Sequence, residues 1–252
     1  EIDPFPPMRE WLYSRNAVFE ALRAGRRQAF HLWVAEGSQE KGRLAEIIQQ
    51  AGSRRIPIER VHRSRLDKLS SGHQGVALET SAYAYSDLGR ILELAGQRAE
   101  QPFLLILDTL QDPQNMGTLL RTAEIVGVHG VILPLARTAT ITPAVVNASS
   151  GACEHLLIAQ ANLAQAIASL KEHDVWVIGL EGGELAQPPG AVRLDGAIAL
   201  VVGNEGEGMR QLVRDSCDLL MHLPMRGKIE SLNAAVAGSV ALYLAWQARQ
   251  YQ

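Results

Sequence analysis

Residues 103–128 read FLLILDTLQDPQNMGTLLRTAEIVGV. The run opens with five apolar residues and an aspartate and shows no alternation of polar and apolar side chains, which is typical of a strand buried on both faces of a sheet. A polar segment follows this strand and leads into a helical pattern. Ligands of open α/β folds bind at the carboxyl edge of a parallel sheet, so the stretch predicts a functional site at that edge.

Four more apolar runs occur later in the chain, with helical segments between them: GVILP, VWVIGLE, AIALVVG and LLMHLP. Runs of this kind that alternate with helices predict a parallel sheet covered on both faces. The longest helical pattern runs from Ser231 to about Gln250 and has one apolar face. The larger part of the chain is therefore expected to be an α/β domain.

The first part of the chain predicts a smaller α/β unit. Residues 14–25, SRNAVFEALRAG, indicate a helix with Ser14 as its N-cap and Gly25 as its stop. A second helix is expected over residues 38–52, and three short strands are expected at residues 31–36, 56–61 and 76–81.

The division into domains follows from these patterns. The opening residues EIDPFPPM are left outside the fold, and residues 82–100 are polar and helix-prone without a clear core pattern. We therefore expect a small domain over residues 9–81, a linker over residues 82–100 and a larger domain over residues 101–252.

Charge is distributed unevenly along the 252 residues, whose net charge is −3. Residues 1–80 carry a net charge of +3, whereas residues 101–252 carry −5. Six basic residues fall between Arg54 and Lys68. Such a stretch suits the phosphates of a nucleic acid, although it is equally typical of a solvated face, and the sequence leaves both interpretations open.

Several classes of protein are disfavoured by composition. The only two cysteines, Cys153 and Cys217, have no spacing typical of a disulfide framework, and the seven histidines lack metal-site spacing. No apolar run approaches the roughly 20 residues that cross a bilayer. We expect a soluble, cytoplasmic protein without a metal ion and without membrane contact.

Three polar motifs lie where the apolar strands end. The first places Asn115 and Arg121 after the strand that begins at residue 103, and the second, GNEGEG at residues 203–208, places Glu205 in a glycine-rich loop. Each residue has a plain alternative: Asn115 as a turn residue, Arg121 as a surface cation and Glu205 as a helix cap. The glycine spacing is not that of a nicotinamide-binding loop, which argues against an oxidoreductase.

The third motif is LPMRGKIESLNAAVAGSVALY, residues 223–243. Glu230 or Ser231 could simply cap the last helix. Asn233 is harder to explain in this way, because it opens a helix of apolar and small residues, where a buried amide without a partner would be costly.

Together these motifs resemble those of the SpoU (TrmH-like) ribose methyltransferases of the SPOUT superfamily. The resemblance lies in the order NxGxxxRxA, GNEGxG and PMxGxxxSLNxxVA, and it covers residues 103–250; the segment NASSGACEHL also fits the family pattern. The stretch from YSRNAVFEAL to HQGVALET is similar to the ribosomal-protein-like RNA-binding domain of the RlmB-like branch.

The resemblance implies a trefoil-knotted α/β domain that binds S-adenosyl-L-methionine (SAM) through the backbone of the knot. Carried over position by position, the cofactor would contact Gly203, Leu223 and Leu232. The family's catalytic residue matches Arg121, and the residues expected to complete the site are Asn115, Glu205, Ser231 and Asn233. Whether Arg121 is a general base, or only positions the RNA and neutralises a phosphate, stays open, because a guanidinium is normally protonated.

We therefore expect a SAM-dependent RNA 2′-O-ribose methyltransferase that works as a homodimer. A guanosine of 23S rRNA is the favoured target, because the RlmB-like domain arrangement resembles that of rRNA enzymes, and tRNA is the alternative. A non-catalytic RNA-binding module is the alternative from another class. The sequence does not identify which RNA or which nucleotide is modified, nor how far the N-terminal domain sets specificity.

Overall fold

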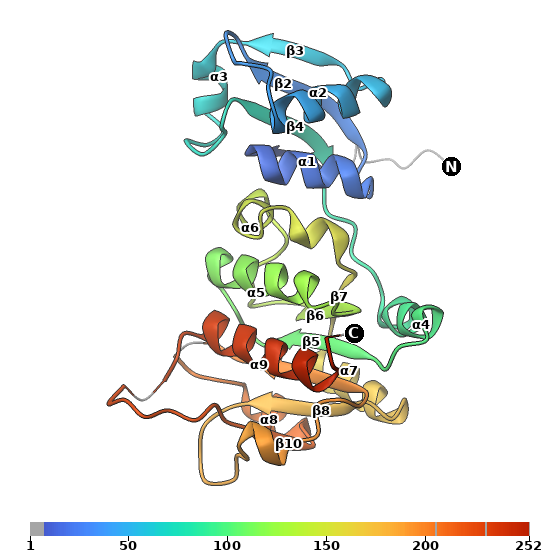
Figure 1. Ribbon diagram of the computed structural model, residues 1–252, viewed down its shortest axis with the longest axis vertical. Helices are drawn as coiled ribbons and strands as arrows, with labels where there is room; N and C mark the ends of the chain where they lie inside the picture. The colour runs from blue at the N-terminus through green and yellow to red at the C-terminus, as the bar shows by residue number, and fades with distance from the viewer. Residues whose placement is uncertain (1–7, 205, 230, 252) are drawn as a thin grey trace. The chain divides into compact units, whose positions relative to one another are not determined.

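The computed structural model describes residues 8–204, 206–229 and 231–251, and these form two compact units (Figure 1). The first unit contains residues 8–84 together with residues 141–155. The second contains residues 85–140 and 156–251. Because residues 141–155 lie between two parts of the second unit in the chain, the first unit is built from two separate segments.

A four-stranded mixed sheet forms the centre of the first unit, in the order β1-β4-β2-β3. Its strands are β1 (Arg9–Tyr13), β2 (Ala29–Ala35), β3 (Ile58–Val61) and β4 (Val76–Ser81). Strand β4 is antiparallel to both β1 and β2, whereas β2 and β3 are parallel. The sequence did not predict β1, because Leu12 is its only fully buried residue and the hydrophobic pattern is correspondingly weak.

The helices of the first unit are α1 (Arg15–Ala24), α2 (Arg43–Ser53), α3 (Arg63–Asp67), α6 (Pro143–Ala148) and the 3₁₀ turn η1 (Ala152–His155). Helix α1 ends as expected at Gly25, which has a φ of 64° and donates its N–H to the Ala21 carbonyl. Ser14 precedes the helix with a φ of 74°, and its side chain makes no capping hydrogen bond, so the predicted side-chain cap is wrong.

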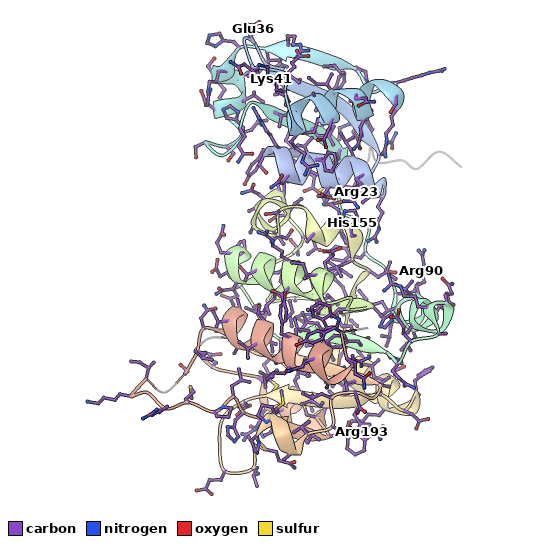
Figure 2. The ribbon with its side chains drawn as sticks, viewed as in Figure 1. Arg23, Glu36, Lys41, Arg90, His155 and Arg193 are labelled. Atoms are coloured by element: carbon purple, nitrogen blue, oxygen red, sulfur yellow. The ribbon has the colours of Figure 1, made fainter. Side chains whose placement is uncertain are left out.

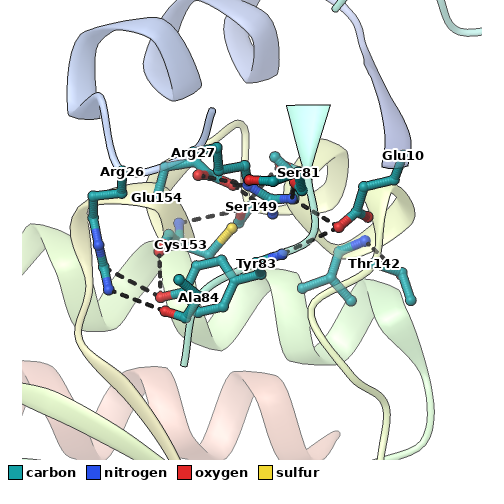
Figure 3. Close-up of polar contacts among 12 residues, drawn as sticks. Glu10, Arg26, Arg27, Ser81, Tyr83, Ala84, Thr142, Ser149, Cys153 and Glu154 are labelled. Atoms are coloured by element: carbon teal, nitrogen blue, oxygen red, sulfur yellow. Dashed lines mark hydrogen bonds and ion pairs between the residues drawn. The ribbon is translucent and has the colours of Figure 1, made fainter. Parts of the chain in front are cut away.

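A buried ionic cluster holds residues 141–155 in the first unit (Figure 3). Arg27 Nε donates to both carboxylate oxygens of Glu154 at 3.0 Å, and Arg27 Nη1 donates to Glu10 Oε1 at 2.8 Å. Burial alone would lower the pKa of Arg27, but the carboxylates of Glu154 and Glu10 outweigh it and raise that pKa. The Arg27 and Glu154 side chains are 1% and 0% exposed, so removing either would leave a buried charge short of a partner.

Six parallel strands form the sheet of the second unit, in the order β10-β8-β9-β5-β6-β7. They are β5 (Phe103–Leu107), β6 (Gly130–Pro134), β7 (Ile158–Ala161), β8 (Trp176–Leu180), β9 (Ile198–Val202) and β10 (Leu219–Met221). The predicted α/β class with a parallel sheet, preceded by a smaller α/β unit, is therefore confirmed. The trefoil knot stays a prediction.

Helices cover both faces of this sheet: α4 (Leu88–Arg98), α5 (Pro113–Ile125), α7 (Leu163–Glu172), α8 (Gln211–Ser216) and α9 (Ala234–Ala248), with the 3₁₀ turn η2 (Pro189–Ala191). Leu104 and Ile106 of β5 pack in one core with residues of α4, α7 and α8. Helices α5 and α9 pack together on the other face, where Gly238 allows close approach: a Cβ there would lie 2.5 Å from Leu119 Cδ2.

The segment expected as a linker contains helix α4. Its Ile91 is fully buried, and a Cβ added at Gly130 of β6 would lie 2.5 Å from the Ile91 side chain. Asp87 Oδ1 caps the helix by accepting the Arg90 N–H at 2.8 Å. Helix α4 thus packs into the core of the second unit. Its apolar face is narrow, with Ile91 and Ala95 as its only fully buried residues.

No helix within the described ranges is long and apolar enough to span a bilayer. Both cysteines are free thiols, and burial raises the pKa of Cys153 to about 12.

Candidate functional site

A cavity of about 660 Å³ lies in the second unit, where β8, β9 and β10 end. Its walls include the residues that directly follow these three strands, and Ala234 at the start of α9 also lines it. The volume falls within the roughly 300–1,000 Å³ of small-molecule sites. Four predicted residues line this one cavity: Gly203, Leu223, Ser231 and Leu232.

The loop after β9 is tightly folded around Gly203. A Cβ at Gly203 would lie 2.4 Å from the backbone carbon of Gly208 and from the backbone nitrogen of Met209. Asn204 and Gly208 exchange two backbone hydrogen bonds of 3.0 Å, which close the loop into a narrow hairpin. Only glycine fits position 203, because any larger side chain would push the loop open.

Asn204 and Asp108 tie this loop to the end of β5. Asn204 Nδ2 donates to the Thr109 carbonyl at 3.1 Å, and Asn204 Oδ1 accepts the Gly206 N–H at 3.0 Å. The fully buried Asp108 carboxylate accepts the Arg210 N–H and Arg210 Nε, both at 2.8 Å. These contacts hold both ends of the loop that lines the cavity.

A pair of side-chain amides joins α5 to α9 beside the cavity. Asn233 Oδ1 caps α9 by accepting the N–H groups of Ala235 and Val236, at 2.9 and 3.2 Å. Asn233 Nδ2 then donates to Asn115 Oδ1 at 3.1 Å. The two predicted amides are thus in direct contact although 118 positions separate them in the chain. Ser231 does not cap the helix and instead lines the cavity.

Helix α5 begins at Pro113, inside the polar segment that follows β5. Asp112 caps it by accepting the Gln114 N–H at 3.0 Å, and Pro113 occupies the first helical position. Asn115 is therefore in the first turn of the helix rather than in a loop. Arg121 is an exposed residue of the same helix, about two turns from its start, and does not line the cavity.

The structure places only part of the predicted site. Glu205 and Glu230 lie outside the described residues. Ser231 and Leu232 belong to the segment between β10 and α9, in which Arg226 and Lys228 are also exposed. No group of three or more metal-ligating side chains occurs in the part of the chain that the structure describes.

Sequence reasoning missed several wall residues. Glu181 and Gly182 follow β8, and His222 follows β10, and all three line the cavity. His222 directly precedes the third motif, so a histidine lies in the cavity wall beside the motif residues. The rule that ligands bind beyond the carboxyl ends of parallel strands could have found these residues, because each follows an apolar run.

Comparison with known proteins gives two family matches that together span most of the chain. Residues 102–243 match the model of the SpoU rRNA methylase family, and residues 11–86 match the model for RNA 2′-O ribose methyltransferase substrate binding.

YacO of Bacillus subtilis (strain 168), named for the TrmH family of tRNA/rRNA methyltransferases, is 40% identical over 95% of this chain and 96% of its own length. A relative from Staphylococcus haemolyticus (strain JCSC1435), named for the same family, is 38% identical over 94% of this chain and 95% of its own length.

Solved structures share the fold. The SpoU methyltransferase AviRb from Streptomyces viridochromogenes, solved with the cofactor AdoMet, matches 97% of this chain and 92% of its own with a TM-score of 0.79 at 20% identity. An AdoMet-bound rRNA methyltransferase from Sinorhizobium meliloti matches 95% of this chain and 87% of its own with a TM-score of 0.77, also at 20% identity.

Proposed function

Because this chain belongs to the SpoU rRNA methylase family, we propose that it transfers a methyl group from SAM to a ribose 2′-hydroxyl of RNA. The single observation that carries this proposal is the cavity at the ends of β8, β9 and β10, beside the contact between Asn233 and Asn115. The cavity supplies a place for the cofactor, and the amide pair and Arg121 lie on helices beside it.

The cavity suits SAM in shape and chemistry. Gly203 lines the cavity, and its backbone lies so close to Gly208 and Met209 that no Cβ fits between them, which keeps the loop narrow at the cavity wall. Leu223 and Leu232 offer apolar surface for an adenine ring, and Ser231 offers a hydroxyl. When bound, SAM supplies an electrophilic methyl group on its sulfonium sulfur.

The residues of this chain would act on the methyl acceptor. A ribose hydroxyl is a poor nucleophile until its proton is removed or polarised and its oxygen is held in line with the methyl group. A guanidinium is a poor general base in proteins, so we assign to Arg121 the neutralisation of an RNA phosphate and the positioning of the ribose. The fixed amides of Asn115 and Asn233 would orient the ribose or Arg121, and Glu205 would align the motif loops.

The acceptor is proposed to be rRNA, with a guanosine of 23S rRNA as the favoured target and tRNA as the alternative. The substrate-binding match over residues 11–86 supports an RNA anchor ahead of the catalytic domain. We further propose a cytoplasmic homodimer, because α9 exposes the apolar side chains of Val236, Val240 and Tyr243.

The decisive experiment is methyl transfer from labelled SAM to total rRNA and total tRNA, followed by mapping of 2′-O-methylated positions. Arg121→Ala should abolish transfer and leave SAM affinity within a few-fold, because Arg121 acts on the RNA side. Thr118→Ala is a matched control, since Thr118 is exposed on the same helix and its hydroxyl donates only to the Gln114 carbonyl. A loss of SAM binding in Arg121→Ala as large as the loss of transfer would contradict the assigned role. If only tRNA becomes labelled, tRNA and not rRNA is the substrate.

A further inference from the structure

A second hollow, of about 680 Å³, lies in the first unit and is not part of the site described above. It is lined by Arg15 at the start of α1, Lys41 in the loop after β2, Arg63 at the start of α3, and the turn before β4. Lys41 is labelled in Figure 2. Three cationic side chains from distant parts of the chain therefore meet there, and no acidic residue lines the hollow.

The turn that forms one wall is rigidly organised by His73. The ring of His73 is fully buried, and its Nδ1 accepts the Gly75 N–H at a distance of 2.8 Å. Its Nε2 lies 3.0 Å from Asp67 Oδ1. Gln74 and Gly75 have φ values of 51° and 83°. The wall is thus held in a backbone conformation that the buried imidazole supports.

The same turn positions Arg15. Gln74 Oε1 accepts the Arg15 backbone N–H at 3.0 Å, and Arg15 Nε donates to the Gln74 carbonyl at 3.2 Å. Among the described residues, the terminal nitrogens of this guanidinium have no protein acceptor. A side chain anchored through Nε can present these nitrogens to a ligand as a fork.

The other two cations are likewise without ion-pair partners among the described residues. Glu36 begins the loop that carries Lys41 (Figure 2). It is not among the residues that line the hollow. By contrast, neighbouring arginines of the same basic stretch are neutralised: Arg60 pairs with Glu40, and Arg65 pairs with Glu59. Of this stretch, Arg63 is the cation that lines the hollow.

We propose that Arg15, Lys41 and Arg63 form a phosphate cradle that binds the sugar-phosphate backbone of a folded RNA. Cations without ion-pair partners, in a hollow that no carboxylate lines, favour phosphodiester groups. The hydroxyl of Ser38 and the amide of Gln39 also line the hollow and add polar groups. Contacts of this kind anchor an RNA and do not read its sequence. The inference rests on the proposed function, because it assigns the substrate anchor of the same enzyme.

The test uses the full chain and the double variant Lys41→Glu, Arg63→Glu. Arg54→Glu, Arg55→Glu is the matched control, because these residues follow α2, lie outside the hollow and change the charge equally. Binding to rRNA transcripts is measured by filter retention over a series of salt concentrations. The cradle variant should bind at least about tenfold more weakly, and its slope of log K against log salt should fall by about two units.

The control variant Arg54→Glu, Arg55→Glu should change the affinity and the salt slope much less. The proposal is overturned if the two double variants lose the same affinity and slope, or if the cradle variant binds as the unmodified chain does. Unchanged thermal midpoint and SAM affinity establish that the variant is folded, and Lys41→Gln, Arg63→Gln repeats the test should the glutamates unfold it. If the unmodified chain binds RNA through the cradle but methylates none, the proposed function fails and the cradle stands.

Discussion

Asp108→Asn is the substitution that best tests how the cavity loop is held. Asp108 is fully buried at the end of β5, and its two oxygens accept the Arg210 N–H and Arg210 Nε. Asparagine has nearly the same shape but keeps only one side-chain oxygen. Whichever way the amide turns, its NH₂ group faces a donor of Arg210.

The expected cost follows from this geometry. One hydrogen bond to a charged group is lost, which is worth about 1.5–3 kcal/mol. The Arg210 side chain is 43% exposed, so water partly screens the lost ion pair and little is added for it. We expect a loss of about 2–3 kcal/mol, which for a chain of this size corresponds to a fall in thermal midpoint of roughly 4–12 °C.

The assay combines a thermal melt with isothermal titration of SAM. Because Asp108 holds the end of the loop that lines the cavity, we expect SAM affinity to fall together with stability. Asp195→Asn is the control, since Asp195 pairs with Arg193 on the exposed surface, and its midpoint should not change. An unchanged midpoint for Asp108→Asn would refute the energetic argument, and a lowered midpoint with unaltered SAM affinity would refute the positioning role.

Three further predictions concern the loop at Gly203, the pH dependence of stability and the oligomeric state. Gly203→Ala should abolish SAM binding in a titration, because its Cβ would collide with the loop backbone at 2.4 Å and push the cavity wall out of place. Near-normal affinity would show that the narrow loop is not needed for the cofactor. Burial lowers the pKa of His129 below its ordinary 6.5, so its contribution to stability is present above that pH and is lost as the pH falls below it. Melts between about pH 8 and pH 5 should show this loss, and His129→Asn should flatten it. Light scattering at micromolar concentration should show a dimer that Tyr243→Asp weakens, whereas a monomer before mutation would exclude the proposed assembly.

Local patterns predicted most of the larger unit. Five apolar runs correspond to β5, β6, β8, β9 and β10, because strands buried on both faces need continuous apolar sequence. Strand β7 was missed, since only two of its four residues, Ile158 and Ala159, are fully buried and its pattern is short. The segment at residues 82–100 was recognised as helix-prone, but its packing into the core was not foreseen, because the apolar face of α4 consists of little more than Ile91 and Ala95.

The motifs could also be recognised in the sequence, because each lies within one loop or one helix end, where residue type and spacing are local properties. Gly203, Leu223, Ser231 and Leu232 were named from the resemblance of these motifs to those of the SpoU family, and they line one cavity. The contacts that the motif residues make could not be predicted from the sequence. The hydrogen bond between Asn233 and Asn115, and that between Arg210 and Asp108, each join residues more than 100 positions apart.

Which charges act together was likewise settled only by the folded chain. The basic stretch from Arg54 to Lys68 was evident, but its arginines are partly neutralised by glutamates, and Arg63 alone joins Arg15 and Lys41 at one hollow. Residues 141–155 similarly join the first unit through the buried pair of Arg27 and Glu154. Hydrophobic periodicity is a local property of the sequence. Which charged side chains come together depends on how distant segments pack, and no local pattern predicts that packing.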